Sequence, residues 1–378
     1  MTPRPPSFIR WSLLALALAA AAGVVWLLPS IDRTLLMRGY LAAYLFLLGL
    51  ALGSSALRAL HNLTGGPWGD ALRPAWNAAS LSLPILLLLF IPLALTTSSL
   101  FPWAHGDPTN NDLWSHRAPY LNLTFFLARA GGYFILWIAA DWATRLLPRH
   151  RGINSASLIL YLFTMTHASF DWIMSREAHL YSTAFGLSVI LGQVLSAMAF
   201  AILLSPLPAT STIPPTDRSR TKNLFNDIGN ILLTLVILWM YVAFMQFLVI
   251  WMGNTQEDNA WYIKRGLPDH PTQTLAGWRI VGLLILLLHF LIPFFLLLFR
   301  GAKQYRPALS VIAGMLLGAH LIETFWLIAP SDEGRVPTAP QVSDILLFIA
   351  LPALWFFAFL TFSLKPPKSP PPVEASHD

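Results

Sequence analysis

The sequence predicts an all-α polytopic membrane protein with about ten transmembrane helices. Of the 378 residues, 56% are hydrophobic and 11% are charged, and the mean hydropathy is +0.59. A soluble domain has roughly a quarter of its residues charged, so this composition is typical of a membrane protein. Ten mostly apolar segments also reach the roughly 20 residues that a helix needs to cross a bilayer. Finally, Lys and Arg concentrate in alternate connections between these segments, as they do in multi-pass proteins.

The expected spans follow one another along the whole chain, at 9–29, 38–60, 79–100, 121–147, 155–175, 181–205, 227–252, 274–300, 306–329 and 341–363. Arg4 and Arg10 before an Ala/Leu run suggest a signal peptide, but nine further spans follow, which favours a retained first helix. The Pro/Thr/Ser-rich stretch 206–222 is an expected linker that divides the helices six plus four. The tail KPPKSPPPVEASHD is expected to be disordered.

The basic residues predict the orientation of the chain. With the N-terminus inside, fifteen Lys and Arg residues fall in or beside the inner connections and eight in or beside the outer ones, and Arg129 alone lies within a span. Cytoplasmic loops carry the excess of Lys and Arg in membrane proteins. We therefore predict that both termini are cytoplasmic. The formal net charge of +6 is explained in the same way, without a nucleic-acid partner.

Several kinds of chemistry are excluded by what the sequence lacks. There is no cysteine, so the chain has no disulfide, no cysteine-ligated iron–sulfur cluster and no covalently attached c-type haem. The motifs of Walker loops, dinucleotide-binding folds, zinc proteases and serine hydrolases do not occur either. The sequence thus offers no nucleotide site, no zinc motif and no serine nucleophile, and no catalytic residue is predicted.

Two segments indicate an internal repeat. His167 to Trp172 reads HASFDW at the end of the fifth span, and His320 to Trp326 reads HLIETFW at the end of the ninth. Four helices separate the copies, which describes a parallel repeat. The expected organisation is a peripheral first helix, two four-helix bundles made of helices 2–5 and 6–9, and a peripheral last helix with the Pro-rich tail, at 1–37, 38–180, 181–330 and 331–378.

Ionisable residues within the spans are the candidate functional residues, because such groups are costly in a membrane and usually face the bundle interior. His167 and Asp171 are four residues apart on one helix, and His320 and Glu323 are three apart on another, so each pair is expected to share a face. Together with Arg129, they are expected in one layer of the membrane. The full set of candidates for a proton pathway is Arg129, Asp141, His167, Asp171, Asp227, His289, His320 and Glu323.

Several interpretations of this set remain open. In the structural one, Arg129 pairs with Asp171 or Glu323, and the histidines hydrogen-bond to carbonyls or hydroxyls. In the functional ones, the set carries protons, lines a pocket for a quinone headgroup, or ligates a b-type haem through two of the three histidines. The outer connections hold further polar residues, of which Glu257, Asp258 and Arg176 are either solvated or form contacts with another subunit.

A series of stretches resembles the ActF subunits of alternative complex III, which belong to the NrfD-like membrane proteins. The similar stretches keep their order and spacing from about residue 38 to 330, and they include HNLTGGPWG from His61, LFPWA from Leu100, YLNLTFFLARAGGYFILW from Tyr120, SFDWIMS from Ser169, DIGNILLTLVILWMYVAFMQFLVIWMGN from Asp227 and HFLIPFFLLLFRGAK from His289. Two outer motifs of the family are altered here, at Asn254–Asp258 and Met174–Leu180.

The resemblance implies an integral subunit of a quinol:electron-acceptor oxidoreductase in the electron transport chain of a bacterial cytoplasmic membrane. Such a subunit is a scaffold with a proton pathway and a contact with quinone, and it is not catalytic alone. Haems and iron–sulfur clusters are then expected on partner subunits, namely a multihaem cytochrome and an iron–sulfur protein, beside an NrfD-like sister subunit. The alternatives are a stand-alone proton-coupled secondary transporter, which uses the same acids, and a b-haem electron-transfer protein.

Overall fold

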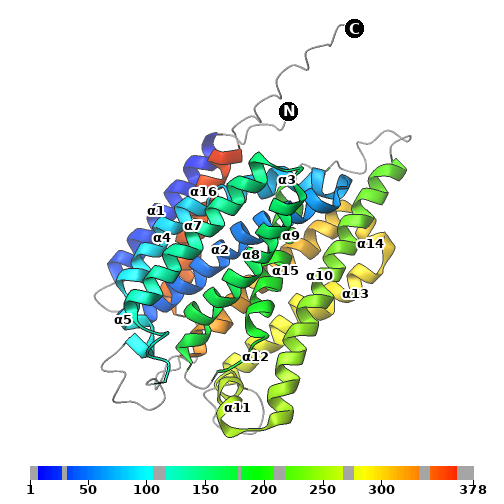
Figure 1. Ribbon diagram of the computed structural model, residues 1–378. Helices are drawn as coiled ribbons and strands as arrows, with labels where there is room; N and C mark the ends of the chain where they lie inside the picture. Colours follow the sequence, from blue (N-terminus) through cyan, green and yellow to red (C-terminus); the bar gives the residue numbers. More distant parts are fainter. Residues whose placement is uncertain are drawn as a thin grey trace.

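The computed structural model describes residues 7–27, 32–104, 116–177, 180–205, 207, 218–266, 276–331 and 341–363. Within these ranges the secondary structure is helical and contains no strand. Figure 1 shows long helices side by side in one bundle, with the start of α1 (Ser7–Leu27) and the end of α16 (Val342–Ser363) at the same end of the molecule. The predicted all-α polytopic class is confirmed.

Eight helical segments are long and apolar enough to cross a membrane: 33–64, 67–95, 123–146, 185–204, 219–253, 277–298, 306–328 and 342–360. Two further long helices are α1 (Ser7–Leu27), with a shorter apolar stretch, and α8 (Arg151–Trp172), which carries more polar residues. Each of the ten expected segments therefore coincides with a helix or with a broken helix in the structure. The chain is a multi-pass membrane protein.

The remaining elements follow in chain order. They are α2 (Arg33–Thr64), α3 (Pro67–Ser80), α4 (Leu83–Leu95), α5 (Thr97–Leu100), η2 (Pro102–Ala104), α7 (Leu123–Leu146), η4 (Met174–Arg176), α9 (Phe185–Leu204), α10 (Arg218–Gly253), α11 (Gln256–Ile263), α12 (Ala276–Ile285), η8 (Leu286–Leu291), α13 (Ile292–Leu298), α14 (Arg300–Gln304), α15 (Arg306–Ile328), η9 (Ala329–Ser331) and α16 (Val342–Ser363).

Two of the spans are interrupted helices. Leu81 and Ser82 separate α3 from α4, and Pro84 occupies the first turn of α4, where its missing N–H breaks no helical bond. The eighth span changes from α12 into the π-helix η8 and then into α13, whose first turn holds Pro293. A π-turn inserts an extra residue and rotates the following side chains, and a proline cannot donate the bond that a regular helix needs there.

Helices α2 and α9 pack against each other at the centre of the molecule. Almost all of the apolar stretch of α2 is buried, and it carries Gly49 and Gly53 four residues apart. A Cβ atom at Gly53 would meet the backbone carbonyl of Gln193 on α9, and one at Gly49 would meet the Gln193 side chain. Small residues at this spacing let two membrane helices approach closely.

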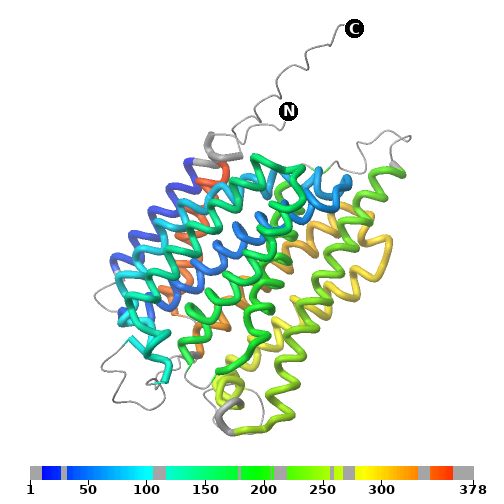
Figure 2. Tube along the Cα trace, in the orientation of Figure 1, coloured from blue at the N-terminus to red at the C-terminus, as the bar shows by residue number. Residues whose placement is uncertain are grey.

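The other helices surround this central pair in two groups. On one side, α3–α4, α7 and α8 close a ring with α2; on the other, α10, α12–α13 and α15 close a ring with α9. Helices α1 and α16 pack on each other at the edge, and α16 also contacts α2 (Figure 2). Arg38 links α2 to α16, because its Nη2 donates to Asp344 Oδ2 at 3.2 Å with both side chains buried.

The helix boundaries correct two sequence-based assignments. Arg38 and Arg58 stand at the two ends of the expected span 38–60, and the orientation count includes them with the outer and the inner connections. In the structure both lie within the 32-residue helix α2 and are buried. Arg129 is consequently not the one arginine inside a span. The linker predicted at 206–222 also ends earlier than expected, because residues 218–222 already belong to the start of α10. In both cases the helix continues through polar residues at its end, which a count of apolar residues misses.

Candidate functional site

A buried carboxylate, two histidines and a tryptophan from three helices meet inside the ring of α9, α10, α12–α13 and α15. Glu323 and His320 come from α15, His289 from η8 and Trp239 from α10. Trp239 Nε1 donates to Glu323 Oε1 at 3.0 Å, and His320 Nδ1 lies 3.0 Å from Glu323 Oε2. His289 Nδ1 lies 3.3 Å from the same oxygen. We call these four residues the Glu323 cluster.

Local structure directs each side chain of the cluster inward. The three-residue spacing on α15 places His320 and Glu323 on one face, as expected. The π-helix turns His289 into the interior, where its exposed fraction is 0%. Gly192 on α9 leaves the space that the His320 ring fills, because a Cβ atom there would lie 2.8 Å from His320 Cε1.

His289 is the least satisfied member of the cluster. Its Nδ1 is close enough to Glu323 for an ion pair, but the ring is not directed at the oxygen, and neither of its nitrogens has a hydrogen-bond partner among the described residues. Its ring lies against Trp239, with centroids 4.1 Å apart. Buried polar atoms are nearly always hydrogen-bonded in folded proteins, so a fully buried imidazole with one long contact to a carboxylate and no partner for Nε2 among the described residues requires an explanation.

A cavity of about 550 Å³ opens beside the cluster. Residues of α9, α10, α11, α12 and α15 line it, most of them apolar or aromatic, and Glu323 is the acidic residue among them. Phe244 on α10 and Leu283 on α12 form part of its wall and are exposed. Both helices belong to segments that are long and apolar enough to span a membrane.

Arg265 closes the cavity at the end next to α11. It is buried and donates to the backbone carbonyls of Trp261, Trp326 and Leu327, and its guanidinium lies 3.7 Å from the centre of the Trp261 ring. Burial lowers the pKa of Arg265 to about 9, and Glu177 partly offsets this effect. The guanidinium therefore stays charged at pH 7 and presents a cation at this end of the cavity.

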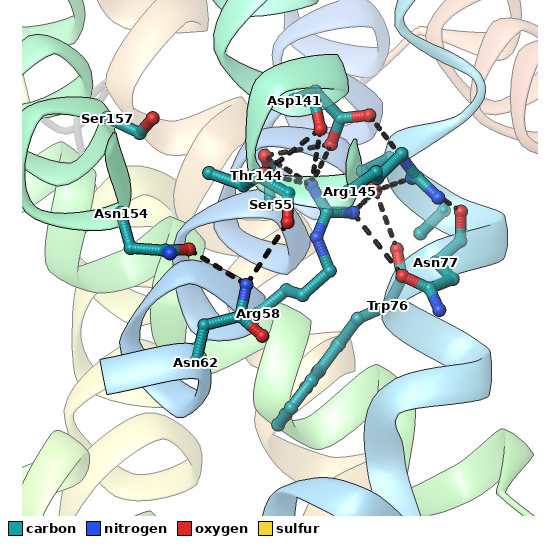
Figure 3. A network of polar contacts seen from close by, with 12 residues as sticks. Ser55, Arg58, Asn62, Trp76, Asn77, Asp141, Thr144, Arg145, Asn154 and Ser157 are labelled. Atoms are coloured by element: carbon teal, nitrogen blue, oxygen red, sulfur yellow. Dashed lines mark hydrogen bonds and ion pairs between the residues drawn. The ribbon is translucent and has the colours of Figure 1, made fainter. Parts of the chain in front are cut away.

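A second group surrounds Asp141 on α7 (Figure 3). Arg58 Nη2 on α2 donates to Asp141 Oδ1 at 2.6 Å, and Arg145 Nε donates to Oδ2 at 2.6 Å. Hydroxyl groups of Ser55, Ser80 and Thr144 complete the network between α2, α3 and α7. One carboxylate thus binds two guanidinium groups, one of them fully buried. The network therefore links α2, α3 and α7 to one another.

A third group pairs Asp171 on α8 with Arg129 on α7. Arg129 Nε and Nη2 donate to the two carboxylate oxygens at 2.9 and 2.8 Å, and the Tyr133 hydroxyl donates to Oδ2 at 3.0 Å. This is a bidentate bridge between neighbouring helices, which combines geometric specificity with charge assistance. Of the two expected partners of Arg129, the structure selects Asp171 and not Glu323.

Asp171→Asn is expected to lower thermal stability, because it removes the charge that holds a largely buried arginine. Breaking a buried ion pair from one side costs about 3–5 kcal/mol, and the partial exposure of Arg129 moves the expected value to the lower end. Unfolding of the detergent-purified protein, followed by intrinsic fluorescence, measures the change. A variant as stable as the unmodified protein would contradict the role of the bridge, and Asp227→Asn on an exposed position is the control.

The structure does not gather the remaining candidates. His167 is exposed and its Nδ1 contacts the Phe163 carbonyl at 2.8 Å, while Asp171 one turn later is buried, so the two do not share an inward face as expected. Asp227 is exposed on α10. The candidates therefore do not form one cluster: they divide between the Glu323 cluster, the Asp141 network and the Arg129–Asp171 bridge, with His167 and Asp227 apart.

Two expectations concerned outer connections. Arg176 was expected at the surface, but it lies in η4 with an exposed fraction of 1%, inside this chain's own fold. The neighbouring Glu177 is also buried and accepts from Lys264 Nζ at 2.8 Å. The loop folds back against the turn after α11, which a local pattern cannot show. The side chains of Glu257 and Asp258 lie outside the described residues.

Trp239, Gly192 and Arg58 are site residues that the sequence did not indicate. A tryptophan inside an apolar helix carries no signal that separates a hydrogen-bond donor from an ordinary core residue. Gly192 lies in a run of small residues without a distinguishing pattern. Arg58 had a usable signal, since it is a charged residue within an extended helical pattern.

Comparison with known proteins found no matching family model and no matching curated protein for this chain. Its class is consequently defined by the fold and the site. It is an all-α multi-pass membrane protein with a buried His–His–Glu cluster at the edge of an apolar cavity.

Proposed function

We propose that this chain is an integral membrane subunit of a quinol-oxidising respiratory complex and that it binds a quinol or quinone in the cavity beside Glu323. The observation that carries the proposal is the cavity itself. It is lined mainly by apolar and aromatic side chains of membrane-spanning helices, together with one acidic residue, Glu323, and two arginines, Arg265 and Arg279. No feature of comparable weight among the described residues favours the alternative function, a stand-alone transporter of a water-soluble substrate.

The size and chemistry of the cavity fit a lipophilic ring compound. Small-molecule pockets span about 300–1,000 Å³ and are mostly apolar, with a few polar groups that fix orientation. The rings of Trp239, Trp261 and Trp326 and the flat faces of Phe244 and Phe247 line this one. A planar headgroup can lie against these rings, while its apolar tail leaves between α10 and α12.

Glu323 is placed to orient the headgroup. Its carboxylate already accepts from Trp239, and a carboxylate has lone pairs for further donors, so a quinol hydroxyl can donate to it. Oxidation of a quinol releases two electrons, and this chain has no cysteine for an iron–sulfur cluster or a c-type haem. We therefore propose that the electrons pass to cofactors of partner subunits, which is why the proposal includes a complex.

Gly282→Trp on α12 is expected to fill the cavity and to weaken quinone binding at least 10-fold. The atoms nearest to a Cβ atom at Gly282 belong to the Trp326 ring, at 3.7 Å or more, so the backbone at this lining position tolerates a side chain. Binding of decylubiquinone is measured on the detergent-purified protein by quenching of tryptophan fluorescence. Gly314→Trp on α15, where a Cβ atom meets nothing within 4 Å, is the matched control.

Equal affinity in the two variants would contradict a quinone site in this cavity. The partner part of the proposal has a separate measurement. Mild purification from the native membrane should recover the chain together with haem-containing and iron–sulfur subunits, and a stable solitary protein would contradict it.

A further inference from the structure

We infer that His289, His320 and Glu323 form a binding site for a divalent transition metal ion, with a geometry that suits zinc and with one open coordination position. The site does not depend on the proposed function, since it rests on three side chains of this chain. All three are buried, and their ligand atoms lie within 4.8 Å of one another.

The distances from each histidine to the carboxylate match the size of a tetrahedral site. Bonds of about 2.0–2.1 Å to nitrogen and oxygen place neighbouring ligand atoms roughly 3.3 Å apart. His320 Nδ1 and His289 Nδ1 lie 3.0 and 3.3 Å from Glu323 Oε2. Small side-chain rotations therefore suffice to place one ion in contact with all three.

The donor set selects the class of ion. Imidazole nitrogens suit zinc and its neighbours in the first transition series, whereas calcium and magnesium prefer sites made of oxygen alone. Two histidines and one glutamate with a vacant fourth position are also the ligand set of several catalytic zinc sites. The Trp239 ring packs against the His289 ring, with centroids 4.1 Å apart, and so restricts the orientation of this ligand.

The surroundings of the three ligands support this assignment. Trp239 donates to Glu323 Oε1, which fixes the carboxylate and leaves Oε2 for a metal ion. Such outer contacts orient metal ligands in known sites. A bound ion would also give the fully buried His289 Nδ1, whose contact with Glu323 Oε2 is long at 3.3 Å, a direct bonding partner. The networks around Asp141 and Asp171 differ, because arginines there already satisfy the carboxylates.

The fourth position can be reached from the cavity. Glu323 lines the cavity, so a ligand that enters there approaches the cluster from its open side. An ion of charge +2 beside one carboxylate leaves one positive charge in an apolar region, where an unpaired charge is costly. An anionic oxygen ligand, such as hydroxide, neutralises the site.

Cobalt(II) titration of the full-length protein in detergent, after removal of metals with a chelator, tests the inference. We expect one equivalent of Co²⁺ to bind with the intense visible absorption of a four-coordinate ion, and Zn²⁺ to displace it. His289→Ala and Glu323→Gln should each weaken binding at least 10-fold. His167→Ala, which removes an exposed histidine outside the cluster, should change nothing.

Three results would overturn the inference: no stoichiometric binding, equal binding by the ligand variants, or the weak spectrum of a six-coordinate ion. If the ligand variants do not fold, Trp239→Phe keeps all three ligands and removes the contact to Oε1, and it should weaken binding about 10-fold. Gly282→Trp separates the two proposals, because it should block quinone while the metal still binds. Metal binding without quinone binding would contradict only the proposed function.

Discussion

Gly53→Val is expected to leave little folded protein, because it separates the two central helices. A Cβ atom at this position meets the backbone carbonyl of Gln193 on α9, and its neighbours include the Ala197 methyl group. Extra atoms in a packed core cost about 1–3 kcal/mol when side chains can adjust, and more when the obstacle is backbone. Since α2 and α9 belong to different rings, their separation affects both.

The amount of monodisperse protein after solubilisation, measured by size-exclusion chromatography, checks this result. Gly49→Ala should have a smaller effect, because the atoms it meets belong to the Gln193 side chain, which can move. Gly314→Val on the exposed face of α15 is the control for a change from glycine within a membrane helix. A normal yield of Gly53→Val would show that the close contact between α2 and α9 is dispensable.

Asp141→Ala is expected to destabilise the protein by about 3–5 kcal/mol, the cost of breaking a buried ion pair from one side. The substitution leaves Arg58, with an exposed fraction of 1%, beside Arg145 without the carboxylate that joins them. Thermal unfolding of the purified protein measures the loss, and Asp227→Ala at an exposed position is the control.

A second variant separates the charge effect from lost packing. In Asp141→Ala with Arg58→Met, the buried cation is also removed, so part of the stability should return. If the double variant is less stable than Asp141→Ala alone, the arginine contributes through its hydrogen bonds to serine and threonine and not through the pair. If Asp141→Ala has the same thermal stability as the unmodified protein, the network does not stabilise the contact between these helices.

The spans could be predicted because each is a local property. A run of about 20 apolar residues crosses the membrane wherever it stands in the chain, since lipid leaves backbone groups no partner outside the helix. This accounts for the agreement at all ten segments. The ends of helices were predicted less well, as Arg38 and Arg58 show, because a helix can continue through charged residues that the rest of the fold pairs.

The site was predicted only in part, for a related reason. The sequence identified His289, His320 and Glu323 as costly residues within spans, and the three-residue spacing on α15 gave one contact. It did not show that these three residues meet one another and not Asp171 or Asp141. The position of a residue along its helix does not tell which other helix its side chain contacts. His167 has the same residue type as His320 and yet faces outward.

By itself, the sequence determined the class of protein, the approximate spans and the absence of cysteine chemistry, because composition and periodicity act within one helix. Only the tertiary structure decided which buried charges meet, that Arg176 is covered, and that an apolar cavity ends at Glu323. These features depend on the rotation and the distance between helices far apart in the chain. Those are set by the close contact at Gly53, the π-turn before Pro293 and the space left by Gly192, which are packing relations that no single segment encodes.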